Sequence, residues 1–246
     1  MKANTMNKNA ALSNHNKIVT KNCFTIYNLF SDKAKQLILK TKNQGGATLF
    51  VGSGISLDSP TLLPSGENVT RYLAELLTEQ FELTSRKEKT EVINAIIGTP
   101  FEYVWDQSPQ NKQLEFVFIN EYKNRQPNNI HYAIRDLVIN GTIKHVITTN
   151  YDTCLDQVFQ NIDFIKEVAT ENDSRNIESN QGIYFKIHGS AKSGLESTIV
   201  YRLSHEGILP SWKQKVLRRC LSNANLIVVG YSGLDFEICP EIKLAK

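Results

Sequence analysis

Residues 47–56 read ATLFVGSGIS, in which the apolar run 47–51 is followed by two glycines around a serine and then by Ile55-Ser56. The run has the length of a strand and no polar face, which is typical of a strand buried in a parallel sheet. Glycines directly after such a strand let the backbone approach a ligand closely, and the amides of the following turn favour phosphate oxygens. Two glycines also make an ordinary tight turn, and the third glycine of the usual dinucleotide fingerprint is absent. Gly52-Ser53-Gly54 alone therefore leaves both interpretations open.

Helical and extended patterns alternate on both sides of this stretch. Helices are expected from Ser31 to Gly45, after an N-cap at Ser65, after Pro127 and over 211–221. Further strands are expected at 145–149, 164–168, 183–187, 198–201 and 226–229. The stretch 86–125 has helical patterning broken at two Pro-containing points, which predicts a helical insertion at about 84–126 that lies over the sheet. The alternation predicts an α/β fold with a doubly wound, mostly parallel, Rossmann-like sheet.

Length and charge favour one domain with an N-terminal tail. The 246 residues fit a single α/β domain over 31–246. The chain has 28 Lys and Arg against 25 Asp and Glu, but four of the lysines precede Asp32, the first acidic residue. Residues 1–30 contain seven Asn and little periodicity, and are expected to form a flexible tail. Because the remaining body is close to neutral and has no long basic run, direct nucleic-acid binding is not expected.

Hydropathy and cysteine spacing exclude several other classes. The chain start lacks the apolar core of a signal peptide, and no apolar stretch approaches the ~20 residues that a bilayer requires. Four cysteines stand at 23, 154, 220 and 239 without any Cys-x-x-Cys pair. This spacing argues against a zinc ribbon and against a disulfide scaffold, so we expect reduced thiols, a cytoplasmic location and no metal.

Three further polar clusters follow predicted strands. They are Thr149-Asn150-Tyr151-Asp152, His188-Gly189 and Gly230-Tyr231-Ser232, with Asp235 beyond the last. Each has a structural alternative, since Asp152 or Asp235 could cap a helix and Asn150 could satisfy a turn. His188 could equally be a solvated strand end. The carboxyl ends of parallel strands share one edge of a sheet, where ligands bind in open α/β folds, so the four strand ends together predict one polar site.

Residues 44–237 resemble the sirtuin-like NAD-consuming fold, in the form found in the defence-associated sirtuins of bacteria. Gly52-Ser53-Gly54-Ile55-Ser56 is similar to the opening glycine motif of that family with its trailing serine. Ile147-Thr148-Thr149-Asn150-Tyr151-Asp152 is similar to the family's Asn-x-Asp strand end, in the form typical of the defence branch. His188-Gly189 resembles the catalytic His-Gly, and Gly230-Tyr231-Ser232 resembles the late Gly-x-Ser that holds the adenosine ribose.

Two departures from the family bear on the reaction. Protein deacylases of this family carry a four-cysteine zinc module between the catalytic His and the late glycine motif, where this chain has only Cys220. They also carry a Pro-Asp-Phe-Arg segment after the first motif, where this chain reads Leu62-Leu63-Pro64-Ser65-Gly66-Glu67. Both departures argue against deacylation and leave the NAD-cleaving motifs in place.

The resemblance implies a role for each motif residue. Asn150 orients the ribose hydroxyls and the attacking water, and His188 is the general base. Asp152 holds the nicotinamide carboxamide, and Ser56 lies near the nicotinamide ribose. The other residues bind the rest of the dinucleotide: Gly52, Ser53 and Gly54 at the pyrophosphate, and Gly230 and Ser232 at the adenosine half.

The implied activity is that of an NAD+ glycohydrolase, with NAD+ as the substrate and nicotinamide and ADP-ribose as products. A protein deacylase and a non-catalytic sensor of NAD+ or ADP-ribose are the alternatives. The branch further implies an effector that depletes NAD+ in anti-phage defence. Such an effector is expected to be a homo-oligomer or to act with a sensor domain or partner protein, under a phage-derived trigger. Family members of this branch often continue into long sensor regions, so the domain is expected to belong to a longer chain.

Overall fold

The structure is a computed structural model that describes residues 32–99, 101–107, 112–200, 208–222, 225–233, 235 and 237–244. The tail expected at 1–30 lies outside these described residues.

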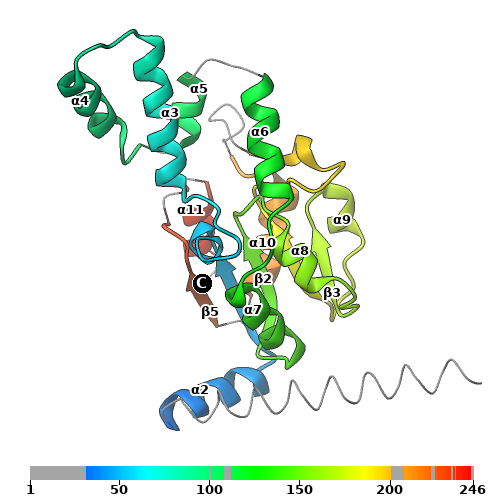
Figure 1. Ribbon diagram of the computed structural model, residues 1–246. Coiled ribbons are helices and arrows are strands. Elements are labelled where there is room, and N and C mark those ends of the chain that lie inside the picture. Colours follow the sequence, from blue (N-terminus) through cyan, green and yellow to red (C-terminus); the bar gives the residue numbers. More distant parts are fainter. Residues whose placement is uncertain are drawn as a thin grey trace, which may run out of the picture.

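A five-stranded parallel sheet forms the centre of the fold, in the order β3-β4-β2-β1-β5 (Figure 1). The strands are β1 (Ala47–Val51), β2 (Ile143–Thr148), β3 (Ile165–Val168), β4 (Gly182–Lys186) and β5 (Leu226–Val229). Each of them matches a predicted strand to within two residues, and β1 is an interior strand, between β2 and β5, with every residue buried. The predicted α/β fold with a Rossmann-like sheet is confirmed.

Helices surround the sheet and also cover its carboxyl end. They are α2 (Asp32–Asn43), α3 (Gly66–Gln80), α4 (Arg86–Ile96), α5 (Phe101–Gln107), α6 (Lys112–Lys123), α7 (Asn129–Ile139), α8 (Cys154–Phe159), α9 (Glu171–Arg175), α10 (Ser211–Leu221) and α11 (Ile238–Leu244). Two short 3-10 helices, η1 (Ser53–Ser56) and η2 (Glu196–Thr198), complete the described elements. Ser65 caps α3 as predicted, because its side chain accepts a hydrogen bond from the backbone N–H of Asn68 at 3.2 Å.

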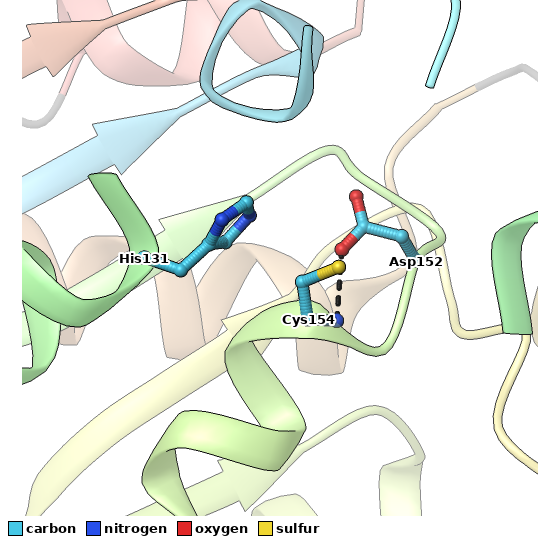
Figure 2. Close-up of side chains that lie close together, drawn as sticks. All are labelled: His131, Asp152 and Cys154. Atoms are coloured by element: carbon cyan, nitrogen blue, oxygen red, sulfur yellow. Dashed lines mark hydrogen bonds between the residues drawn. The ribbon is translucent and has the colours of Figure 1, made fainter. Parts of the chain in front are cut away.

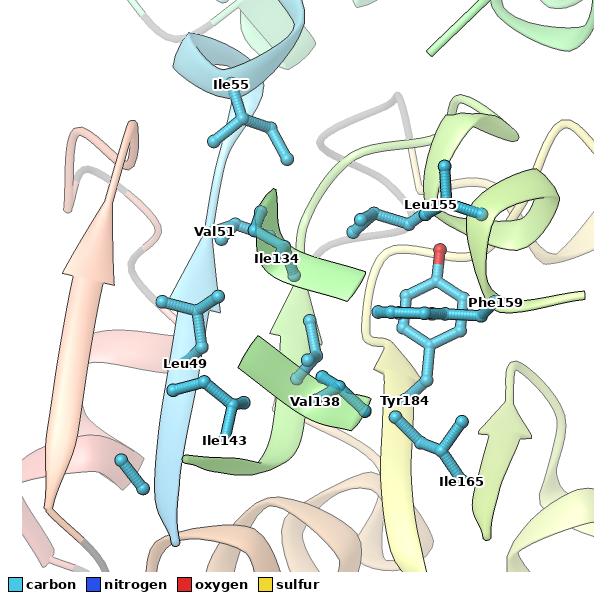
Figure 3. Close-up of a cluster of buried hydrophobic side chains, with 13 residues drawn as sticks. Leu49, Val51, Ile55, Ile134, Val138, Ile143, Leu155, Phe159, Ile165 and Tyr184 are labelled. Carbon is cyan, nitrogen blue, oxygen red and sulfur yellow. The ribbon is translucent and has the colours of Figure 1, made fainter. Parts of the chain in front are cut away.

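Apolar side chains divide between the two faces of the sheet. Leu49 and Val51 of β1 pack with α7 and α8 on one face, in the cluster that Figure 3 shows. Phe50, which points the other way, packs with α10 and α11 on the opposite face. Successive side chains of a strand point to opposite faces, so a continuous apolar run is what a sheet covered on both sides requires.

Helices α3, α5 and α6 meet above the carboxyl ends of the strands (Figure 1). Their apolar side chains, among them Leu73 and Trp105, pack against Tyr151, Ala191 and Ile199 in the loops that follow β2 and β4. These helices therefore form a roof over the edge of the sheet where the polar clusters were predicted to meet.

The strand predicted at 198–201 is wrong. Thr198 ends the 3-10 helix η2, and neither Ile199 nor Val200 belongs to a strand, while residue 201 lies outside the described part of the chain. Ile199 is buried in the apolar cluster beneath the roof, and the N–H of Val200 donates to the carbonyl oxygen of His188 at 2.9 Å. This short apolar run is buried as part of a loop that the roof helices cover. Hydropathy alone does not distinguish such burial from pairing in a sheet.

Across the described residues, we find no helix with the length and apolar character needed to span a bilayer.

Candidate functional site

A cavity of about 480 Å³ lies beneath the roof at the carboxyl ends of the central strands. Its lining includes eight of the nine predicted site residues: Gly52, Ser53, Ser56, Asn150, Asp152, His188, Gly230 and Ser232. The ninth, Gly54, packs behind this lining. The polar clusters at four separate strand ends therefore come together around one hollow.

Ser56 joins the first motif to the second. Its side chain is almost fully buried at the end of η1. The hydroxyl donates to Oδ2 of Asp152 at 3.0 Å and accepts from Nδ2 of Asn150 at 3.3 Å. Nε2 of His131, which belongs to α7, lies 3.4 Å from the same hydroxyl. One serine therefore fixes the relative positions of the amide and the carboxylate that follow β2.

Asp152 is held on both sides of its carboxylate and at its main chain. Oδ2 accepts a hydrogen bond from the Ser56 hydroxyl, and Oδ1 accepts one at 3.0 Å from the backbone N–H of Cys154, at the start of α8. The main-chain oxygen of Asp152 accepts from Nζ of Lys186 at 2.7 Å. The N-cap position of α8 is Thr153 rather than Asp152, but the Asp152 carboxylate still binds the first N–H of that helix, and Asp152 also lines the cavity.

His188 follows β4 at the start of a tight turn in which the main chain of Gly189 lies directly against that of Thr198. Gly189 has φ +88°, and a Cβ placed there would lie 2.1 Å from the carbonyl oxygen of Thr198. Nε2 of His188 lies 3.4 Å from Oε1 of Glu237 and 3.5 Å from Oδ1 of Asp235. Burial by itself lowers the pKa of His188, but the nearby carboxylates, first of all Glu237, outweigh burial and raise this pKa above the ordinary value.

The three motif glycines bring the ends of β1 and β5 into direct contact. The N–H of Gly54 donates to the carbonyl oxygen of Gly230 at 2.9 Å, and a Cβ on Gly54 would lie 2.6 Å from the Gly230 Cα. A Cβ on Gly52 would lie 2.7 Å from the same carbonyl oxygen. Side chains at these positions would push the two strand ends apart, so the glycines keep this corner of the cavity as bare backbone.

The cavity lining is acidic. Glu102 of α5, Asp152 and Asp235 line it together with Glu67, and no Lys or Arg appears among the described lining residues. Such a site favours positive charge in its ligand. Phosphate groups would have to be bound by backbone N–H groups rather than by basic side chains, which agrees with the glycine-rich corner.

Comparison with protein families gives one match. Residues 144–242 match the family model of the SIR2-like domain. This part of the chain is similar to a SIR2-like domain. No curated protein matches the chain.

The matched segment runs from β2 to α11 and contains Asn150, Asp152, His188, Gly230 and Ser232. The first glycine motif precedes it, and the structure connects the two, since β1 pairs with both β2 and β5. The similarity supports a sirtuin-type, NAD-related function. It says nothing of the helices α3 to α6, which supply the roof of the cavity.

Two buried lysines hold main-chain groups of the candidate site, and sequence reasoning missed both. Nζ of Lys186 donates to the Asp152 carbonyl oxygen and to Oδ2 of Asp156 at 2.8 Å. Nζ of Lys213, in α10, donates to the carbonyl oxygen of Ile187, next to His188. A lysine at the last position of the otherwise apolar strand β4, followed by the apolar Ile187, is the signal that could have indicated a buried charge pair.

His131 is a second buried residue that the sequence analysis missed. It lies in the first turn of α7, where Asn128 and His131 form a reciprocal N-terminal cap. Its Nδ1 lies 2.8 Å from Oδ1 of Asn128, while Nε2 faces Ser56. Burial lowers the pKa of His131, against the opposing charge of Asp152, so a neutral imidazole is favoured here.

An aromatic wall from the roof completes the lining. Phe118 and Tyr122 of α6 line the cavity, and both rings contact Tyr151 of the loop after β2, with centroids 6.1 Å and 5.9 Å from it. Burial and the Asp152 charge raise the pKa of the Tyr122 phenol, which stays protonated. These residues lie in the stretch expected as a helical insertion, where hydropathy gave no reason to single out individual rings.

Proposed function

We propose that this chain is an NAD+ glycohydrolase, which uses water to break the bond between nicotinamide and ribose. The observation that carries the proposal is the contact of Ser56 with both Asn150 and Asp152, in a cavity that His188 also lines. Cleavage of this bond needs a firmly held dinucleotide, an orienting amide and a single base. Residues of these types line the same hollow.

The leaving group explains why one base is sufficient. The nicotinamide ring of NAD+ is cationic and leaves as a neutral pyridine with the bonding electron pair, so no general acid is needed. The oxygen of water forms the new bond to the ribose carbon, and its proton passes to the base and then to solvent. Positive charge develops on the sugar in the transition state, and the acidic lining around Asp152 and Asp235 is suited to stabilise it.

We assign Asn150 to the orientation of the ribose hydroxyls and the water, and His188 to the general base. The carboxylates that raise the pKa of His188 make its neutral form a stronger base. Asp152 would hold the nicotinamide carboxamide, with Ser56 beside the nicotinamide ribose. The remaining contacts are to the pyrophosphate, from Gly52, Ser53 and Gly54, and to the adenosine half, from Gly230 and Ser232.

We further propose a biological role on the ground of the Thr149-Asn150-Tyr151-Asp152 form of the second motif. In this proposal the chain is a cytoplasmic effector that depletes NAD+ during bacterial anti-phage defence. A homo-oligomer, or a sensor domain or partner protein that responds to a phage-derived trigger, would keep it silent until it is needed.

Incubation with NAD+ and quantification of both products tests the proposed reaction. We expect equal amounts of nicotinamide and ADP-ribose. The double variant Asn150→Ala, His188→Ala is expected to lose at least about 10²-fold in rate, since removal of a general base alone costs that much. Asn172→Ala, at an exposed position on α9, is the matched control and should keep the rate of the parent chain.

Each other result has a definite meaning. Persistent NAD+ loss in the double variant would show that the residue assignment is wrong. A strict requirement for an acylated peptide would make the protein a deacylase. Calorimetric binding of NAD+ that is recovered intact, under every activating condition tried, would make it a sensor.

A further inference from the structure

Three metal-ligating side chains of different chemistry meet behind the wall of the cavity. They are His131 of α7, Asp152 after β2 and Cys154 at the start of α8, all of them buried (Figure 2). Their ligand atoms, one nitrogen, one oxygen and one sulfur, lie within 4.8 Å of one another. Neither His131 nor Cys154 has a role in the proposed hydrolysis.

The donor set is typical of zinc and unsuited to the cations that proteins bind through oxygen alone. Imidazole nitrogen, thiolate sulfur and carboxylate oxygen in a group of three are zinc ligands, whereas Ca²⁺ and Mg²⁺ are bound through oxygen. In a tetrahedral zinc site the ligand atoms lie about 3.3–3.6 Å apart, given bonds of about 2.0–2.3 Å. The three atoms would therefore have to close by roughly 1 Å, which small side-chain rotations supply. Ser56, whose hydroxyl lies 3.0 Å from Asp152 Oδ2, faces the fourth position.

The surroundings of the cluster suit such an ion. Nδ1 of His131 lies 2.8 Å from the amide oxygen of Asn128 and 3.2 Å from the backbone N–H of the same residue, and these two contacts require opposite tautomers. Metal binding selects the tautomer with the proton on Nδ1, in which the shorter contact to the amide oxygen fixes the ring and the Nε2 lone pair faces the cluster. Zn²⁺ with one carboxylate and one thiolate has no net charge. A complex without net charge suits this position, because the positively charged Lys186 ammonium already lies against the main-chain oxygen of Asp152.

We propose that His131, Asp152 and Cys154 form an inhibitory site for Zn²⁺ behind the wall of the NAD+ cavity. On binding, a zinc–sulfur bond forms at Cys154 Sγ, and the thiol proton passes to solvent. The ion withdraws Asp152 and Ser56 from the cavity, so a substrate can no longer use them. Metal binding stands independently of the proposed function, and only the inhibition rests on it.

Titration with Co²⁺, which takes zinc's ligands and is visible, tests the binding step. We expect the intense thiolate-to-cobalt charge-transfer band in the full chain, and its disappearance when Zn²⁺ is added. Cys154→Ser should abolish the band. Cys220→Ser, at a buried cysteine on the other face of the sheet, and Cys239→Ser should retain it. Absence of the band in the parent chain, or its survival in Cys154→Ser, overturns the proposal.

Two further measurements keep the proposal testable if Cys154→Ser does not fold. X-ray absorption on the zinc-loaded parent chain should show one sulfur at about 2.3 Å and lighter ligands at about 2.0–2.1 Å, and a spectrum without sulfur overturns the site. His131→Asn should weaken zinc affinity at least about tenfold, and unchanged affinity counts against it.

The inhibition has its own readout. Zn²⁺ should suppress nicotinamide release in the parent chain and in Cys220→Ser, and a chelator should restore it. Zinc that binds through Cys154 without changing the rate would contradict the inhibitory role. A chain that shows the cobalt band but never cleaves NAD+ would refute the glycohydrolase and leave the metal site standing.

Discussion

Replacement of Lys186 by methionine is expected to lower the free energy of unfolding by about 3–5 kcal/mol. Lys186 is fully buried, and its ammonium donates to the Asp152 carbonyl oxygen at 2.7 Å and to the Asp156 carboxylate at 2.8 Å. Methionine keeps an unbranched apolar stem, so little packing is lost. It leaves the Asp156 carboxylate, only 9% exposed, without its counter-charge, and an uncompensated buried charge is the main cost.

Urea denaturation of four variants, Lys186→Met, Asp156→Asn, the double variant and a surface control, isolates this effect. The double variant Lys186→Met, Asp156→Asn removes the stranded charge and should recover part of the stability that Lys186→Met loses. Lys192→Met is the matched control, because Lys192 is about half exposed and pairs with Glu167 at 2.7 Å on the surface. Its loss should be about 1 kcal/mol or less.

Two outcomes would refute this reasoning. One is a loss for Lys186→Met no larger than that for Lys192→Met, which would mean that the buried ammonium does not neutralise Asp156. The other is strict additivity of the two losses in the double variant, which would mean that the two groups act independently.

Three other sites in the fold, at Glu237, Gly189 and His145, give further predictions. Glu237→Gln removes the carboxylate that contributes most to the raised pKa of His188, so this pKa should fall. Because the proposed base must be neutral to accept a proton, the rise of kcat/KM with pH should then move to lower pH. An unchanged pH profile would contradict the assignment of His188. Gly189→Ala places a Cβ 2.1 Å from a carbonyl oxygen and should cost at least about 1–3 kcal/mol in urea denaturation and abolish nicotinamide release. Gly194→Ala, with a similar φ of +85° and open space around it, is its control and should cost less and keep the activity. Burial lowers the pKa of His145 to about 4, so on acidification the unfolded chain binds a proton at this residue before the folded chain does. Between pH 7 and pH 5, the free energy of unfolding of the parent chain should therefore fall by about 2 kcal/mol more than that of His145→Gln.

The motif residues that line the candidate site were predictable from the sequence, whereas the buried residues that hold them, Lys186, Lys213 and His131, were not. Strand patterns predicted five strands in addition to β1, of which four are present in the structure. Glycines or polar residues directly after β1, β2, β4 and β5 predicted a shared edge. Both inferences depend on local chemistry: the period of a strand and the requirement for glycine where main chains approach closely. The strand prediction at 198–201 was wrong because it rested on local hydropathy alone. Burial of this stretch beneath the roof is a tertiary contact, and in hydropathy it resembles the burial of a strand.

By itself, the sequence determined that the chain builds a parallel sheet with polar residues gathered at one end of its strands. Only the tertiary structure decided which of those residues touch one another and what stands behind them. Ser56 and Asp152 are 96 positions apart, and His131 reaches the same serine from another helix. Contacts of this kind depend on the order of the strands and on which side chains the helices bury against them. No local pattern carries that information, because a buried His, Lys or Glu looks like a solvated one until the chain around it has folded.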